Sequence, residues 1–216
     1  IDGVHTPAGS YAPAKKAFAP RSTLPVYQRQ AFPAALVGEN GADPKTAGTT
    51  VLENDSIRLW HQGDDVLIAS FKTKMNTIGP DVLDGLVQAI EIAEKQYAGL
   101  VIWQTSSLTG GPFSAGADLQ AAMPLFMQGG AKAVEPFVKK FQDTAMRVKY
   151  AQVPVVAAVA GLALGGGCET LMHCAHRVAH LESYIGLVEL GVGLVPAGGG
   201  LKEAALRASN AAATYG

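Results

Sequence analysis

The feature that most limits the possible folds is an apolar run at residues 153–160, which has no polar face. A strand of this kind must be covered on both sides, as strands are in a parallel sheet. Parallel strands need long crossover connections, which are usually helices. Residues 80–97 and 133–150 can supply them, because apolar residues recur there at three- and four-residue spacing. We therefore predict an α/β fold with right-handed crossovers.

Shorter patterns complete this prediction. Two apolar runs, residues 57–60 and 66–71, flank a polar turn cluster and indicate a β-hairpin or two adjacent strands. The remaining expected elements are a strand at residues 100–104, a helix at 168–175, a short strand at 178–180 and a helix at 201–213.

The first 50 residues differ in texture from the rest. They hold six of the twelve prolines and show little helical or strand periodicity. This pattern favours a Pro-rich connector or extension, partly ordered or disordered, over a folded element. We therefore expect two parts, an irregular extension at residues 1–50 and a folded domain at residues 51–216.

Composition excludes several classes of function. The net charge of −1 gives no basic stripe for nucleic acid. No uncharged apolar run reaches the roughly 18 residues of a membrane span. The two cysteines, Cys168 and Cys174, lie too close together for a disulfide framework, so a reducing, cytoplasmic location is expected.

Two glutamates stand in glycine-rich, weakly charged sequence. Glu169 directly follows a triple glycine, and Glu189 lies within residues 185–200, which contain six glycines. Two carboxyl groups brought into an apolar pocket can exchange protons with a substrate near neutral pH. This pattern indicates hydration, isomerisation or related proton chemistry next to a carbonyl.

Two glycine-rich segments precede expected helices, residues 113–119 and residues 164–169. Glycines at the start of a helix leave backbone N–H donors free to hold a carbonyl oxygen that becomes an oxyanion. The alternative is that they only allow tight turns or close packing. A nucleotide loop is disfavoured, because neither a Gly-x-Gly-x-x-Gly after a strand nor a Gly-Lys-Ser/Thr is present.

These segments resemble the crotonase (enoyl-CoA hydratase/isomerase) superfamily. Residues 113–119, Phe-Ser-Ala-Gly-Ala-Asp-Leu, match its first motif, and residues 157–169, which end in Gly-Gly-Gly-Cys-Glu, match its second. Glu189, followed by Leu-Val-Pro-Ala-Gly-Gly-Gly at residues 194–200, is similar to its second-glutamate motif. The resemblance implies a ββα spiral fold, here truncated at the C-terminus because the chain ends soon after Leu206.

The resemblance also implies roles for single residues. The backbone N–H groups of Ala115 and Gly166 would form the oxyanion hole, and Glu169 and Glu189 would hold the catalytic water. We assign Glu169 chiefly to water activation and Glu189 chiefly to the proton on the carbon next to the thioester. The implied coenzyme A contacts are Lys74, Met75, Ala115, Gly116, Ala117, Asp118, Leu119 and Gly166.

Presence of both glutamates favours an enoyl-CoA hydratase of fatty-acid β-oxidation. The alternatives are a 3,2-enoyl-CoA isomerase and a truncated, non-catalytic domain for binding or assembly. The substrate would be a coenzyme A thioester, with no cofactor in this chain. A homo-oligomer, based on a trimer, is one expected partner.

The chain also resembles the C-terminal hydratase part of bacterial multifunctional proteins that begin with a 3-hydroxyacyl-CoA dehydrogenase. Residues 1–50 would then be the connector from that dehydrogenase domain, which would be the alternative partner. The NAD site would lie in the dehydrogenase, outside this chain.

Two other groups of residues were weighed. A zinc site at Cys168, Cys174 and the three histidines nearby is disfavoured by helical spacing, so we expect packed or surface residues and no metal. The apolar residues Met123, Phe126 and Met127 fit either a wall of an acyl pocket or a loosely packed cap.

Overall fold

The computed structural model describes residues 5–6, 9–20 and 46–215. The chain divides into two compact units, Ile1–Pro44 and Lys45–Gly216, which are described separately.

The first unit contains a three-stranded antiparallel sheet. Its strands are β1 (His5–Thr6), β2 (Gly9–Ala12) and β3 (Ala17–Ala19), with the 3₁₀ turn η1 (Pro13–Lys15) between the last two. Strands were not expected here, because elements of two to four residues are too short to show a period of two. Residues 21–45 of the predicted connector lie outside the described residues, and the boundary at residue 50 stays a prediction.

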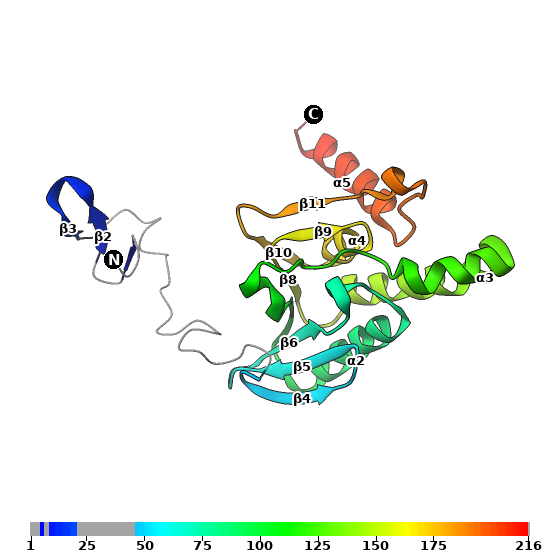
Figure 1. The fold of residues 1–216 in the computed structure, drawn as a ribbon, viewed down its shortest axis with the longest axis horizontal. Coiled ribbons are helices and arrows are strands. Elements are labelled where there is room, and N and C mark those ends of the chain that lie inside the picture. The colour runs from blue at the N-terminus through cyan, green and yellow to red at the C-terminus, as the bar shows by residue number, and fades with distance from the viewer. Residues whose placement is uncertain (1–4, 7–8, 21–45, 216) are drawn as a thin grey trace. The chain divides into compact units, whose positions relative to one another are not determined.

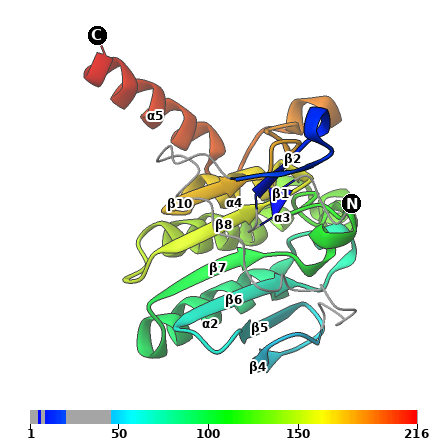
Figure 2. The same ribbon diagram turned by 90° about the vertical axis from the view of Figure 1, so that its left-hand side faces the viewer.

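The second unit is built on a six-stranded sheet in the order β10-β8-β7-β6-β5-β4. Antiparallel pairing joins the first three strands, β4 (Thr49–Glu53), β5 (Ile57–His61) and β6 (Val66–Phe71). Parallel pairing joins β6 to β7 (Gly99–Trp103), β8 (Val155–Val159) and β10 (His176–Ala179). Strand β8 lies inside the parallel part, with a neighbour on each side, as its apolar sequence predicted (Figure 2).

Helices make the connections between the parallel strands. Helix α2 (Pro80–Gln96) links β6 to β7, and α3 (Leu119–Lys149) links β7 to β8. Helix α4 (Gly166–His173) precedes β10, and α5 (Gly200–Tyr215) is the last described element. Shorter 3₁₀ turns are η3 (Lys74–Asn76), η4 (Thr105–Thr109) and η5 (Glu189–Val192).

Helix α3 begins fourteen residues earlier than the periodicity predicted, at Leu119 and not at residue 133. Asp118 caps it by accepting hydrogen bonds from the backbone N–H groups of Gln120 and Ala121. The helix is interrupted at Gly130, whose φ of 63° and ψ of −156° are not helical. This interruption changes the helix phase, which is why one continuous pattern is absent from the sequence.

A second, smaller parallel pair joins β9 (Leu162–Leu164) to β11 (Tyr184–Gly186). Each strand has three residues, and neither was predicted. Single bridges connect Ser114 to Ala163 and Ile78 to Ala117, so the first glycine-rich segment lies beside the second.

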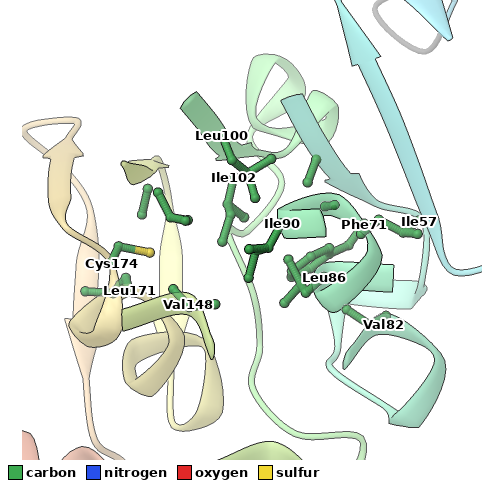
Figure 3. Packing of buried hydrophobic residues seen from close by; sticks show 14 of the residues in the cluster. Ile57, Phe71, Val82, Leu86, Ile90, Leu100, Ile102, Val148, Leu171 and Cys174 are labelled. Atoms are coloured by element: carbon green, nitrogen blue, oxygen red, sulfur yellow. The ribbon is translucent and has the colours of Figure 1, made fainter. Parts of the chain in front are cut away.

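The core lies between the sheet and α2, with further contributions from α3 and α4 (Figure 3). Leu86 and Ile90 of α2 are fully buried, as are Leu100 and Ile102 of β7. Burial of one such side chain stabilises the fold by about 1.5–3 kcal/mol. Helix α2 packs so closely that a Cβ at Gly85 would lie 2.5 Å from Ile57 Cγ2.

None of the described helices has the length and apolar character that a membrane crossing requires.

Candidate active site

Glu169 lies in the first turn of α4 and is only 3% exposed. Gly165, the residue directly before α4, has a φ of 50° and a ψ of −120°, a conformation that favours glycine and turns the chain from β9 into the helix. The triple glycine therefore serves to bring a carboxyl group into the interior at the start of a helix.

The carboxyl group of Glu169 is held by the segment at residues 198–200. Its Oε1 accepts a hydrogen bond of 2.9 Å from the backbone N–H of Gly200. A Cβ at Gly198 would lie 2.6 Å from Glu169 Oε2, so the segment approaches the carboxyl more closely than a side chain permits. Burial raises the pKa of Glu169, the nearby charge of Glu189 adds to this, and the backbone N–H groups oppose it.

Glu189 is the first residue of the short turn η5 and is half-buried. Its Oε2 is buried and has no hydrogen-bond partner among the described residues. A Cβ at Gly165 would lie 3.2 Å from Glu189 Oε1, so this carboxyl lies against the turn that leads to Glu169. Pairing of β9 with β11, extended by a 2.9 Å hydrogen bond from Gly165 N to Gly186 O, brings the two regions together.

Both glutamates line one cavity of about 290 Å³. Much of its remaining wall is apolar and comes from α3, from the end of η5 and from the segment after it; this part includes Val134, Phe137, Val138, Phe141, Val192, Leu194 and Val195. Gln142 of α3 donates a 2.7 Å hydrogen bond to the carbonyl of Ala197 and so ties these two walls together. Low-polarity surroundings of this kind suit carboxyl groups that exchange protons near neutral pH.

The predicted oxyanion donors are only partly brought together. Gly166 is the first residue of α4, where a backbone N–H has no partner inside the helix. The N–H of Ala115, in contrast, donates a 3.1 Å hydrogen bond to the carbonyl of Met75. That donor is therefore already engaged, which the motif alone does not reveal.

The backbone N–H of Ala117 lies beside Gly166 at the start of α4. Two hydrogen bonds join Ile78 to the residues on either side of Ala117. Ile78 N donates to Gly116 O, and Asp118 N donates to Ile78 O. The N–H of Ala117 is not used by this bridge, and a Cβ at Gly166 would lie 3.1 Å from Ala117 N. In the sequence, only Gly116 indicates that Ala117 and Ala115 direct their N–H groups differently. Its φ of 101° reorients the chain between these two residues.

The other predicted coenzyme A contacts are divided. Gly116, Ala117 and Leu119 line the glutamate cavity. Lys74 is exposed and lies outside this lining, and Asp118 uses its carboxylate to cap α3.

Met75 lines a second cavity, of about 470 Å³, at the ends of β6 and β7. This cavity also contains Arg58, which is 4% exposed and has a buried Nη1 without a hydrogen-bond partner among the described residues. Lys72, which pairs with Glu53 at 2.8 Å, adds a second cation. Sequence reasoning missed both basic residues, because neither belongs to a motif.

The cysteines and histidines are dispersed. Cys168, His173 and Cys174 are buried, and burial raises the pKa of the Cys168 thiol to about 11. Across residues 5–6, 9–20 and 46–215, no group of three or more His, Cys, Asp or Glu side chains has the arrangement of a metal site.

Met123, Phe126 and Met127 lie on the exposed side of α3, and Met127 is 77% exposed. They do not line the glutamate cavity, to whose apolar wall α3 contributes Leu119, Ala122 and its part after Gly130. Of the two interpretations, these exposed positions favour a loosely packed cap over a wall of this cavity.

Comparison with curated proteins gives relatives among multifunctional enzymes. A Bacillus subtilis protein described as a probable 3-hydroxyacyl-CoA dehydrogenase is 39% identical over 153 residues, which is 71% of this chain and 19% of that protein. The fatty acid oxidation complex subunit alpha of Psychrobacter cryohalolentis is 32% identical over 151 residues, 70% of this chain and 20% of that protein. The chain thus spans about a fifth of the length of these relatives.

Solved structures agree with the sequence comparison. The enoyl-CoA hydratase of Thermoplasma volcanium superposes with a TM-score of 0.57 at 27% identity, covering 68% of this chain and 57% of that one. This confirms the predicted α/β crotonase fold over the shared part. The profile of the family named enoyl-CoA hydratase/isomerase matches residues 66–215. The fold and the sequence relatives agree, and the family profile matches the greater part of the chain. The chain therefore belongs to the enoyl-CoA hydratase/isomerase family.

Proposed function

We propose that this chain is the enoyl-CoA hydratase part of a fatty-acid β-oxidation enzyme and adds water across the double bond of a 2-enoyl-CoA. The observation that carries the proposal is that Glu169, Glu189, Ala117 and Gly166 line one cavity with an apolar wall. An enzyme that only shifts a double bond needs one group to move a proton. Water addition needs one group to activate water and one to protonate carbon, and two carboxyls meet that need.

The reaction follows from the positions of these groups. The thioester carbonyl accepts hydrogen bonds from the N–H groups of Gly166 and Ala117, which stabilise negative charge on its oxygen. Glu169, as carboxylate, takes a proton from water while the hydroxide oxygen bonds to the distal carbon of the double bond. The π electrons move onto the thioester as an enolate. Glu189, as carboxylic acid, then gives its proton to the carbon next to the thioester.

One H and one OH are added in total, and the proton redistributes between the two carboxyls before the next turnover. The raised pKa of Glu169 brings its proton exchange closer to neutral pH, which suits a group that takes a proton from water and later releases it.

Ala117 replaces Ala115 in this proposal. Use of Ala115 would require breaking its hydrogen bond to Met75, which costs about 1–3 kcal/mol if the carbonyl is left unpaired. The N–H of Ala117 needs no such rearrangement, and Ala115 remains useful because it fixes the Met75 turn next to the site.

The two cavities suggest where the ends of the substrate lie. The apolar wall around Phe137 and Phe141 suits the acyl chain. Met75 belongs to the second cavity, where Arg58 and Lys72 offer positive charge to the phosphates of coenzyme A. We retain Lys74, Met75, Asp118 and Leu119 as residues of the coenzyme A channel, with Asp118 acting through the helix that it caps.

We further propose that the parent protein carries a 3-hydroxyacyl-CoA dehydrogenase with the NAD site, as the description of the Bacillus subtilis relative suggests. The hydratase product would then be the substrate of the dehydrogenase in the same chain. Assembly based on a trimer and a cytoplasmic location belong to the same proposal.

The test is hydration of crotonyl-CoA by the full-length protein, followed as loss of the absorbance of the conjugated thioester. Glu169→Gln is expected to lower kcat by about 100- to 10,000-fold, since it removes the base but keeps the shape of the side chain. Titration with acetoacetyl-CoA checks that the variant still binds the thioester. Isomerisation of a 3-enoyl-CoA without hydration, or near-normal hydration by the variant, would refute the proposal.

A further inference from the structure

We propose that His173 and Glu203 are positioning residues that hold the backbone of residues 198–200 against Glu169. Their effect on catalysis rests on the proposed hydration, whereas their effect on the geometry of the Glu169 carboxyl does not. Neither residue lines the glutamate cavity, so both would act through the segment that contacts the carboxyl.

His173 lies one helical turn after Glu169 on α4 and is 2% exposed. Its Nδ1 is 2.8 Å from the backbone carbonyl of Glu169. Because a carbonyl only accepts hydrogen bonds, Nδ1 must carry the hydrogen, which leaves a lone pair on Nε2 of the neutral ring. That Nε2 is buried, has no hydrogen-bond partner among the described residues, and lies 3.7 Å from Glu203 Oε1.

Glu203 is a buried carboxylate in the first turn of α5, with 3% exposure. Its Oε1 accepts a 2.6 Å hydrogen bond from Lys149 Nζ at the end of α3, and Lys202 Nζ lies 3.3 Å away. Burial alone would raise the pKa of this carboxyl, but the two lysines hold it below its usual range. The backbone N–H of Glu203 donates to Gly199 O at 3.0 Å, so α5 begins directly from the segment in question.

The glycine segment is enclosed by these groups. A Cβ at Gly199 would lie 2.9 Å from His173 Cε1 and 3.0 Å from its Nε2, and the φ of 112° also requires glycine. The imidazole therefore lies against the backbone of Gly199, while Glu203 fixes the residues that follow. The next residue, Gly200, donates to Glu169 Oε1 at 2.9 Å. Movement of the ring or of α5 would thus move the donor that orients the Glu169 carboxyl.

Charge around the imidazole makes the arrangement sensitive to pH. The groups that face it are Glu203 and Lys202 of α5, Lys149 of α3 and the carbonyl of Glu169 on its own helix. Burial lowers the pKa of His173. Below that pKa, a proton on Nε2 would add a donor directed at Glu203 and compete with the two lysines for its carboxylate.

Nuclear magnetic resonance of the ¹⁵N-glycine-labelled chain tests the positioning directly, through the assigned amide of Gly200. The variants are Glu203→Gln and His173→Gln. The control is Glu135→Gln, which removes a charge from an exposed position of α3. We expect the Gly200 amide to shift and lose about tenfold or more of its exchange protection in both variants, but not in the control. In the wild-type chain, the chemical shift of the Gly200 amide should change with pH as His173 takes up a proton. This change should be absent in His173→Gln.

Kinetics of the full-length protein supply the second readout. Both variants should lower kcat by about 10- to 100-fold with KM within about twofold, because a misplaced base weakens the transition state more than binding. Unchanged Gly200 protection and kcat in either folded variant would overturn the proposal; if Glu203→Gln does not fold, His173→Gln decides. A shifted Gly200 amide in a protein that hydrates no enoyl-CoA would leave the positioning intact and refute the hydratase assignment instead.

Discussion

The two glutamates differ in how their carboxyls are held. Glu169 belongs to a helix, is 3% exposed, and accepts a hydrogen bond from Gly200. Glu189 begins a four-residue 3₁₀ turn, and its Oε2 has no hydrogen-bond partner among the described residues. The turn itself holds two exposed apolar residues, Leu190 at 82% and Val192 at 65%. The first carboxyl is thus held by its own chain, whereas the second keeps a buried oxygen that could accept a hydrogen bond from a substrate or water.

The difference fits the proposed division of labour. A base that activates water gains from a fixed position, because the attack angle depends on it. An acid that protonates carbon must reach an atom whose place varies with the bound thioester. A fixed base also explains why the backbone of Gly198 and Gly200 approaches the Glu169 carboxyl so closely.

The largest effect that would test this comparison comes from combining Glu169→Gln with Glu189→Gln. Each change alone should lower crotonyl-CoA hydration by about 100- to 10,000-fold. The double variant should lose little more than the worse single variant, since groups that act as a unit give non-additive losses. The measurement is kcat/KM of all three proteins at one pH. Losses that multiply would show that the carboxyls act independently.

A smaller effect is expected from alanine at two glycines, one on each side of the comparison. At Gly198, a Cβ would lie 2.6 Å from Glu169 Oε2 and 2.7 Å from Phe141 Cδ1, so Gly198→Ala should cost about 1–3 kcal/mol of unfolding free energy. Gly191, in the turn of Glu189, has no atom within 4 Å of its Cβ position, so Gly191→Ala should stay within about 0.5 kcal/mol. Urea unfolding measures both. Equal losses would mean that the Glu189 side is packed as tightly as the other.

The smallest effect concerns the carboxyl of Glu94, which forms an ion pair outside the glutamate cavity. Glu94 of α2 accepts hydrogen bonds from Arg147 at 2.7 and 2.5 Å, and this pairing lowers its pKa to about 2. A lowered folded-state pKa contributes stability above the unfolded value near 4.5, and that contribution is lost as the pH falls toward 2. Glu94→Gln should therefore cost about 1–2 kcal/mol at pH 7 and nothing near pH 2.

The pKa of Glu169 is shifted in the opposite direction, upward. Its raised pKa contributes stability only at low pH, and this is lost as the pH rises through the folded value. Glu169→Gln should leave the unfolding free energy at pH 7 unchanged or higher, which thermal unfolding of both variants would measure. A loss in Glu169→Gln as large as in Glu94→Gln would remove the distinction between a catalytic and a structural carboxyl.

Much of the fold was predictable, because its main elements carry their own patterns. The stripe of Leu86 and Ile90 predicted α2, and the apolar residues of β8 predicted a strand inside a parallel sheet. The first half of α3 was missed because Pro124 and the break at Gly130 interrupt the pattern. Strands β9 and β11 have three residues each, and their pairing is decided by tertiary contacts.

The site was predictable at the level of motifs and not of single donors. The motifs indicated that Glu169, Glu189 and Gly166 belong together, and these three line one cavity. Whether Ala115 or Ala117 offers a free N–H depends on the bridge to Ile78 and on the Met75 carbonyl, both from a distant segment. The sequence indicated only a packed or surface position for His173, and Glu203 was missed, since it lies 34 residues after Glu169 and meets it only through folded backbone.

The order of the elements along the chain has a consequence for synthesis on the ribosome. The strands β4 to β8 and the helix α2 leave the ribosome before α5 and can form the core of this unit before that helix has emerged. Gly200 and Glu203 belong to α5, so a nascent chain already carries Glu169 while the groups that orient it are still inside the exit tunnel. Competence for catalysis would then be acquired only once α5 has left the tunnel, after the core of this unit can form.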